Sequence, residues 1–422
     1  MSSHAALDNP WRVDAEVIGL IGVAHGTSHF FHLLLPPLFP WLIRDFGLSF
    51  TQAGFLMTVF FVISGAGQAL AGFAVDRFGA RPVLFSGMGL LALSGVALGL
   101  ASAYQGLLAA VALAGAGNSI FHPADFTLLN RRVSASRLGH AFASHGLAGN
   151  LGWAAGATAM GSLAAAAGWH AAGFGAALVA AAVLAALVIR REVLQDDIGA
   201  GAAARAESSR RAADQGRPIG PFAFLRSAAV WMCFVFFLLS TGAFGILQNF
   251  APEILRHVYG VGLGMAGAGL TVYLLGSTAG MAAGGFIAAR ARSSDFVVAI
   301  ALAFAALVAL WLASATVPVW ALLPMLAAMG FGSGVAGPNR DLLVRQAATA
   351  RFGAGSFGRV YGFVYSGLDV GLALTPVAFG RLLDAGMFRA ALLGIALLQV
   401  GALLSALRVG QGARERLRPE PA

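Results

Sequence analysis

The sequence predicts an all-α membrane protein of twelve transmembrane helices in two pseudo-symmetric six-helix bundles. Three observations predict this fold. First, 58% of the 422 residues are hydrophobic and only 11% are charged, whereas soluble domains carry about 25% charged residues. Second, apolar stretches long enough to cross a bilayer core of about 30 Å recur along nearly the whole chain. Third, the two halves of the chain repeat each other around one polar linker.

The apolar stretches define the expected helices. Glycine and proline occur inside several of them, and membrane helices tolerate both because neighbouring groups satisfy the freed backbone. The single cysteine, Cys233, lies within an apolar run and predicts no disulfide. The expected spans are 16–43, 49–75, 81–102, 105–131, 137–166, 169–190, 227–256, 263–289, 295–314, 318–347, 356–383 and 387–408.

The arginines predict the orientation, because cytoplasmic loops carry an excess of basic residues. Alternate connections are rich in arginine, and the connections between them hold few. We therefore expect a multi-pass protein of the bacterial inner membrane with both termini cytoplasmic. Because the first fifteen residues are polar and lack a basic segment before a short apolar one, we also expect no cleavable signal. The expected divisions are an N-terminal bundle at 1–190, a cytoplasmic linker at 191–226, a C-terminal bundle at 227–408 and a cytoplasmic tail at 409–422.

An internal repeat relates the two bundles. Ala53-Gly54 in the first half matches Ala266-Gly267 in the second, and Gly115-x-Gly117 matches Gly330-x-Gly332 at almost the same spacing. Paired bundles of this kind are typical of transporters with a site between two lobes. A purely structural duplication of helices is the alternative.

The connection between the second and third helices reads Gly72-Phe-Ala-Val-Asp76-Arg77-Phe-Gly79-Ala-Arg81. Gly72 permits close helix approach, Asp76 suits a facing helix N-terminus, and Gly79 suits a tight turn. With one position changed, the run resembles the signature of the major facilitator superfamily. The resemblance covers nearly the whole chain. It implies that a conformational latch is formed by Gly72, Asp76, Arg77, Gly79 and Arg81. A solvated charged loop is the alternative.

Two further segments resemble the fosmidomycin-resistance-type branch of that superfamily. They are Gly115-Ala-Gly-Asn-Ser-Ile-Phe121-His122-Pro123 and Gly149-Asn150-Leu-Gly152. The resemblance implies proton-driven efflux of a small compound. Two departures leave the direction of transport open, because the fourth helix lacks the intramembrane arginine of drug antiporters and Gly156 is followed by Ala157.

Ionisable and amide side chains inside the expected helices indicate a transport pathway, because each charged group at the bilayer centre costs about 2.5–3.5 kcal/mol or more. His25, His29 and His32 share one face of the first helix at spacings of four and seven. In the family the first, fourth, seventh and tenth helices line the cavity. The remaining candidates are Asn118, His122, Asp125, His145, Asn150, Gln248, Asn249, Arg340, Asp341 and Asp369.

Histidine paired with carboxylate suits proton coupling, because unperturbed histidine changes charge near pH 6.5. We hypothesise that His122 and Asp125, with the histidines of the first helix, bind the coupling proton or a polar substrate group. The alternative for each histidine is a packing role. Asp125 and Arg340 occupy matching positions in the repeat, and we hypothesise that they pair in one state. A transition-metal site is a further alternative, because the three histidines of the first helix together with His122 could coordinate a divalent ion. We do not expect one, because three imidazoles on one helix span about two turns, too far for all to reach one ion.

The expected function is secondary active transport of a small organic molecule by alternating access, as proton-coupled efflux. The alternatives are proton-coupled uptake of an organic anion, a transition-metal ion transporter and a membrane enzyme. No Walker sequence, H-E-x-x-H or G-x-S-x-G pattern occurs, so neither ATP-driven transport nor an enzyme is expected. We expect a monomer with protons, a small-molecule substrate and the bilayer as partners, without a cofactor or nucleic acid.

Overall fold

A computed structural model describes residues 10–195, 223–288, 290, 293–352 and 357–417. Over these residues every long element is a helix and there is no strand. Eleven stretches of the described residues are long and apolar enough to cross a membrane. The 30-residue helix α7 is not among them, because histidine, asparagine and glycine lower its mean hydropathy. With α7, the twelve predicted helices are present and the all-α fold class is confirmed.

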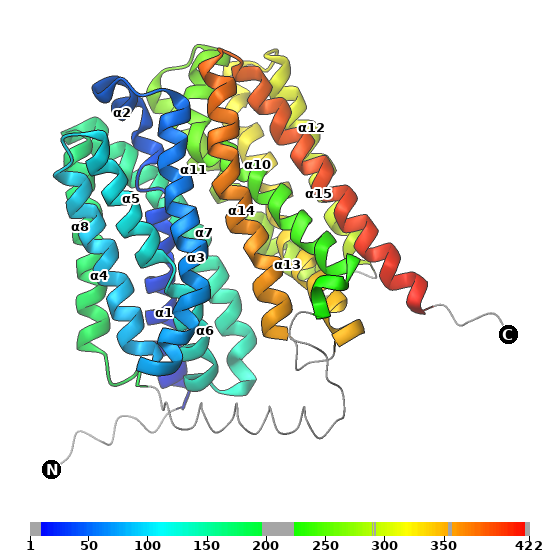
Figure 1. Ribbon diagram of the computed structural model, residues 1–422. Coiled ribbons are helices and arrows are strands. Elements are labelled where there is room, and N and C mark those ends of the chain that lie inside the picture. The colour runs from blue at the N-terminus through cyan, green and yellow to red at the C-terminus, as the bar shows by residue number, and fades with distance from the viewer. Residues whose placement is uncertain (1–9, 196–222, 289, 291–292, 353–356, 418–422) are drawn as a thin grey trace. The chain divides into compact units, whose positions relative to one another are not determined.

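The helices fall into two compact units, drawn in Figure 1. Unit 1 comprises Met1–Gly47 and Val59–Ala204, and unit 2 comprises Leu48–Thr58 and Arg205–Ala422. Most of the predicted linker, from 196 to 222, and the end of the tail lie outside the described residues. The first half of the chain forms α1 (Pro10–His32), α2 (Phe39–Phe46), α3 (Phe50–Phe78), α4 (Ala80–Gly99), α5 (Tyr104–Asn118), α6 (Phe121–Arg132), α7 (Leu138–Ala167) and α8 (Trp169–Ile189).

The second half continues the pattern with six long helices. They are α10 (Ala228–Tyr259), α11 (Leu263–Ala288), α12 (Ser294–Ser314), α13 (Leu322–Phe352), α14 (Phe357–Asp384) and α15 (Phe388–Leu417). In both halves, short 3₁₀ turns join some of the helices, at Pro36–Leu38, Ala135–Arg137, Ala223–Arg226 and Val319–Ala321.

Two predicted helices are broken, and proline explains both breaks. The span 16–43 is interrupted after His32 and resumes as α2, because Pro36 and Pro37 lack the backbone N–H that a continuous helix needs. The span 105–131 is divided between α5 and α6 at Ser119. A continuous helix would bring the ring of Pro123 against the carbonyl four residues earlier, which is that of Ser119. The helix therefore restarts just before His122.

Glycine at helix contacts lets the backbones approach closely. A Cβ atom added to Gly152 of α7 would lie 2.0 Å from the carbonyl oxygen of Gly26 on α1, so only glycine fits there. The two units also repeat one contact: a Cβ on Gly115 would lie 2.5 Å from the oxygen of Phe60, and one on Gly330 would lie 1.9 Å from that of Tyr273. The sequence repeat therefore corresponds to equivalent packing inside each unit.

Candidate functional site

Five imidazoles and one carboxylate gather inside unit 1, and we call this set the histidine cluster. The imidazole rings of His25 and His145 are nearly parallel, and their centroids are 3.5 Å apart. His25 also lies 4.4 Å from His29, and His29 lies 4.8 Å from His32. Three helices supply the members: α1 gives His25, His29 and His32, α6 gives His122 and Asp125, and α7 gives His145.

Asp125 is the carboxylate of the cluster and is fully buried, with 0% of its surface exposed. Its Oδ2 accepts a hydrogen bond from His145 Nε2 at 3.1 Å and lies 3.4 Å from His25 Nδ1. Its other oxygen, Oδ1, has no hydrogen-bond partner among the described residues. One carboxyl group therefore faces two imidazoles in a buried position, where an unpaired charge would be strongly unfavourable.

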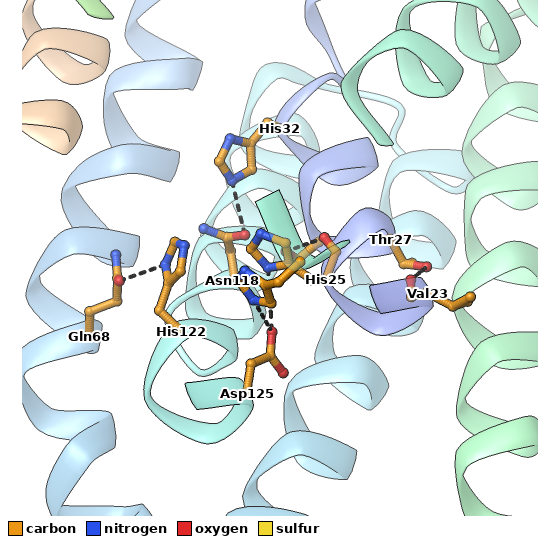
Figure 2. Close-up of polar contacts among 10 residues, drawn as sticks. Val23, His25, Thr27, His32, Gln68, Asn118, His122 and Asp125 are labelled. Carbon is orange, nitrogen blue, oxygen red and sulfur yellow. Dashed lines mark hydrogen bonds and ion pairs between the residues drawn. The ribbon is translucent and has the colours of Figure 1, made fainter. Parts of the chain in front are cut away.

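Two amide side chains bond to His32 and His122, as Figure 2 shows. His32 Nε2 donates to Asn118 Oδ1 at 3.0 Å, and Asn118 Nδ2 donates onward to Ser64 Oγ at 2.8 Å. His122 Nδ1 donates to Gln68 Oε1 at 3.0 Å. These bonds fix which ring nitrogen of each histidine carries hydrogen, and they leave the opposite nitrogen of His122 available.

Aromatic rings border the cluster on two sides. Trp153 stacks on His29 with 4.4 Å between ring centroids, and Phe126 lies 5.0 Å from His145. His29 and His122 are partly exposed, whereas His25, His145 and Asp125 are buried. The cluster therefore has a buried inner part and a more accessible outer part.

Local backbone features explain why the side chains meet. A Cβ on Gly149 would lie 2.8 Å from His29 Nδ1 and 3.1 Å from His25 Nε2, so this glycine of α7 leaves the space that the two imidazoles fill. The break before α6 places His122 and Asp125 in its first two turns. A spacing of three residues puts them on adjacent positions of one helical face.

The structure brings together seven of the predicted site residues. They are His25, His29, His32, Asn118, His122, Asp125 and His145. Asn150 is also predicted and is buried on α7. His140, near the start of α7, is exposed.

The predicted residues of unit 2 lie on three helices. Gln248 and Asn249 are buried on α10, where Asn249 Nδ2 donates to the carbonyl of Gly245 at 2.7 Å. The Arg340 guanidinium on α13 lies 4.4 Å from the ring centroid of Phe237. Asp369 is half-buried on α14, and the side chain of Asp341 lies outside the described part of the structure.

The pairing of Asp125 with Arg340 stays a prediction. Within unit 1, Asp125 contacts His25 and His145. Within unit 2, Arg340 lies over Phe237.

The predicted latch is described only in part. Gly79 has a φ of 89° at the turn between α3 and α4, a conformation that glycine adopts readily. Arg77 is exposed, and Arg81 Nη1 donates to the carbonyl of Arg191 at 3.1 Å. The surroundings of Gly72 and the side chain of Asp76 lie outside the described part of the structure, so the latch function stays a prediction.

The residues that sequence reasoning missed include Gln68 and Trp153, which contact the histidine cluster, and Ser64, which bonds to Asn118. A signal for two of them was present. Ser64 and Gln68 are polar, lie four residues apart in an apolar stretch and therefore share one face of α3. Trp153 carries no comparable signal, because tryptophan is frequent in membrane helices.

Comparisons with known proteins agree with this architecture. A family model described as the Major Facilitator Superfamily matches residues 21–355. The fosmidomycin resistance protein of Escherichia coli (strain K12) is 31% identical over 153 residues, which cover 36% of this chain and 37% of that protein. An uncharacterised MFS-type transporter, YfnC of Bacillus subtilis (strain 168), is 28% identical over 107 residues, covering 25% and 26%. The chain thus aligns with about a third of the length of the E. coli protein and about a quarter of the length of the B. subtilis protein.

Proposed function

Because the chain belongs to the Major Facilitator Superfamily of membrane transporters, we propose that it exports a small organic molecule in exchange for protons. Export would proceed by alternating access, in which the site opens to one side of the membrane at a time. The proposed location is the bacterial inner membrane, with both termini cytoplasmic and the chain acting as a monomer. The proposed halves are the bundles 1–190 and 227–408, with Gly72, Asp76, Arg77, Gly79 and Arg81 as the latch.

The environment of Asp125 carries the proposal. A carboxylate with 0% exposure, bonded to His145 and close to His25, is a group that can take up and release a proton within the membrane. Intramembrane ionisable groups of this kind mark proton relays in transporters. Nearby imidazoles can pass the proton onward, because each ring has two nitrogens that exchange donor and acceptor roles.

The direction of transport takes support from one relative. The E. coli protein is named for resistance to fosmidomycin, and export of a toxic compound is a common route to resistance. The match covers about a third of each chain, so it supports the direction without identifying the compound. Uptake of an organic anion is the competing proposal, and the two predict opposite proton movements.

Proton flux in sealed proteoliposomes tests the proposal. The purified full chain is screened against a library of antimicrobials and organic acids while a pH-sensitive dye reports protons. We expect a compound-dependent flux that Asp125→Asn abolishes and that His140→Asn, at an exposed histidine outside the cluster, leaves intact. Proton movement opposite to the compound means antiport, and movement with the compound means symport. A flux unchanged in Asp125→Asn contradicts the proposed coupling site.

A further inference from the structure

We propose that the histidine cluster binds one divalent transition-metal ion, held by the imidazole nitrogens of His25, His29 and His122. One ligand atom from each residue lies within 4.8 Å of the other two. In a tetrahedral site with metal–nitrogen bonds of about 2.0–2.1 Å, the nitrogens lie about 3.3 Å apart. Side-chain rotations that draw the three rings inward would supply three of the four positions of such a site, and water would fill the fourth.

The three proposed ligands are part of the set of four histidines that the sequence offered for a metal ion. His25, His29 and His32 share a face of α1, but no nitrogen of His32 lies close enough to the others to join the set of three ligands, and its Nε2 bonds to Asn118. His122 from α6 takes its place. Because the third ligand comes from another helix, the objection that two helical turns are too long for one ion no longer applies.

A hydrogen bond orients one of the three proposed ligands, His122, and a carboxylate lies close to a second, His25. His122 Nδ1 donates to Gln68 Oε1, which leaves the lone pair of Nε2 for a metal. His25 Nδ1 lies 3.4 Å from Asp125 Oδ2, which likewise favours Nε2 as the metal-binding atom. Metal-binding histidines almost always donate from their second nitrogen, as His122 does to Gln68. His29 Nδ1 is buried and has no hydrogen-bond partner among the described residues.

Charge and access also suit a divalent ion. Asp125 offsets part of the positive charge through its contact with His25. His29 and His122 are partly exposed, so an ion can approach from their side of the cluster. Imidazole ligands suit zinc, nickel, cobalt and copper, whereas magnesium and calcium prefer oxygen ligands. The chemical class is therefore a borderline transition-metal ion.

The inference stands independently of proton coupling, since it rests on the positions of nitrogen atoms. If the proposed function also holds, metal and proton compete, because a bound ion takes the lone pairs that would accept a proton. A bound ion would then inhibit proton-coupled transport. A chelator that removes the ion would then restore proton-coupled transport.

Metal titration of the purified full chain tests the inference. Chelator-treated protein is titrated with Zn²⁺ by calorimetry and with Co²⁺ by visible absorption, where tetrahedral coordination gives an intense band. We expect one Zn²⁺ per chain, loss of the Co²⁺ band in His29→Asn and in His122→Asn, and no change in His140→Asn. Replacing the outer partner with Gln68→Leu should weaken binding about 10–100-fold.

Two results would overturn the inference: no Zn²⁺ binding by the folded wild-type chain, or binding that all the cluster variants retain. Gln68→Leu replaces a residue outside the proposed ligands, so it still tests the site if a histidine variant fails to fold. The outcome is separable from the proposed function. Zn²⁺ binding without proton flux leaves the metal site standing alone, and proton flux without Zn²⁺ binding leaves the transporter proposal standing alone.

Discussion

His25 on α1 and His145 on α7 stack with 3.5 Å between their ring centroids, and both face the same oxygen of Asp125. This relationship joins three helices of unit 1 at one carboxylate. The packing of α1 against α7 therefore depends on contacts with this one carboxylate.

Gly152 should be intolerant of even a methyl group. In Gly152→Ala the new Cβ would lie 2.0 Å from the carbonyl oxygen of Gly26, so α1 and α7 must separate. We expect a loss of stability of about 1–3 kcal/mol or more, measured as a lower melting temperature in detergent. Gly146→Ala is the matched control on the same helix, since a Cβ there meets nothing within 4 Å. Equal melting temperatures of the two variants would contradict the close contact.

A substitution at Gly149 should impair transport more than it lowers stability. A Cβ in Gly149→Ala would lie 2.8 Å from His29 Nδ1 and 3.1 Å from His25 Nε2, and these ring atoms can rotate away where backbone cannot. We expect impaired transport with a smaller loss of stability than in Gly152→Ala. Transport rate and melting temperature, measured on the same preparation, check this order. Full transport in Gly149→Ala would show that the two imidazoles need no fixed position.

Asn118 should stabilise unit 1 through two hydrogen bonds. It accepts from His32 Nε2 and donates to Ser64 Oγ, in a buried position. Asn118→Leu keeps a similar volume but leaves His32 Nε2 and Ser64 Oγ without these bonds, which costs about 1–3 kcal/mol per buried group. Thermal unfolding measures the loss. The double variant Asn118→Leu with Ser64→Ala should recover part of it, and a further decrease would contradict the proposed chain of bonds.

An exchange of charges tests the predicted pairing of Asp125 with Arg340. If the two pair in one state of the transport cycle, Asp125→Arg combined with Arg340→Asp should transport better than either single variant. A coupling energy of about 0.5–3 kcal/mol is typical of directly interacting residues. Rates of the four proteins form the double-mutant cycle. Additive losses would mean that Asp125 acts through His25 and His145 rather than through Arg340.

The sequence is sufficient to predict most of the fold, because each membrane helix must be long and apolar. The sequence also predicts that His122 and Asp125 lie together, because residues three positions apart are neighbours on the surface of a helix. The helix break at Ser119 is a local consequence of Pro123 and is readable in hindsight. The contacts of Gln68 with His122 and of His145 with Asp125 depend on how α3 and α7 are rotated against α6. Spacing along the chain does not determine that rotation.

The most direct test of proton coupling at Asp125 is accumulation of a transported compound in proteoliposomes under an imposed pH gradient. The wild-type chain should accumulate the compound against its gradient and reverse direction when the pH gradient is reversed. Asp125→Asn should still exchange labelled for unlabelled compound without a gradient, but it should no longer accumulate it. Accumulation by Asp125→Asn at the wild-type level would contradict the central claim that this buried carboxylate couples proton movement to transport.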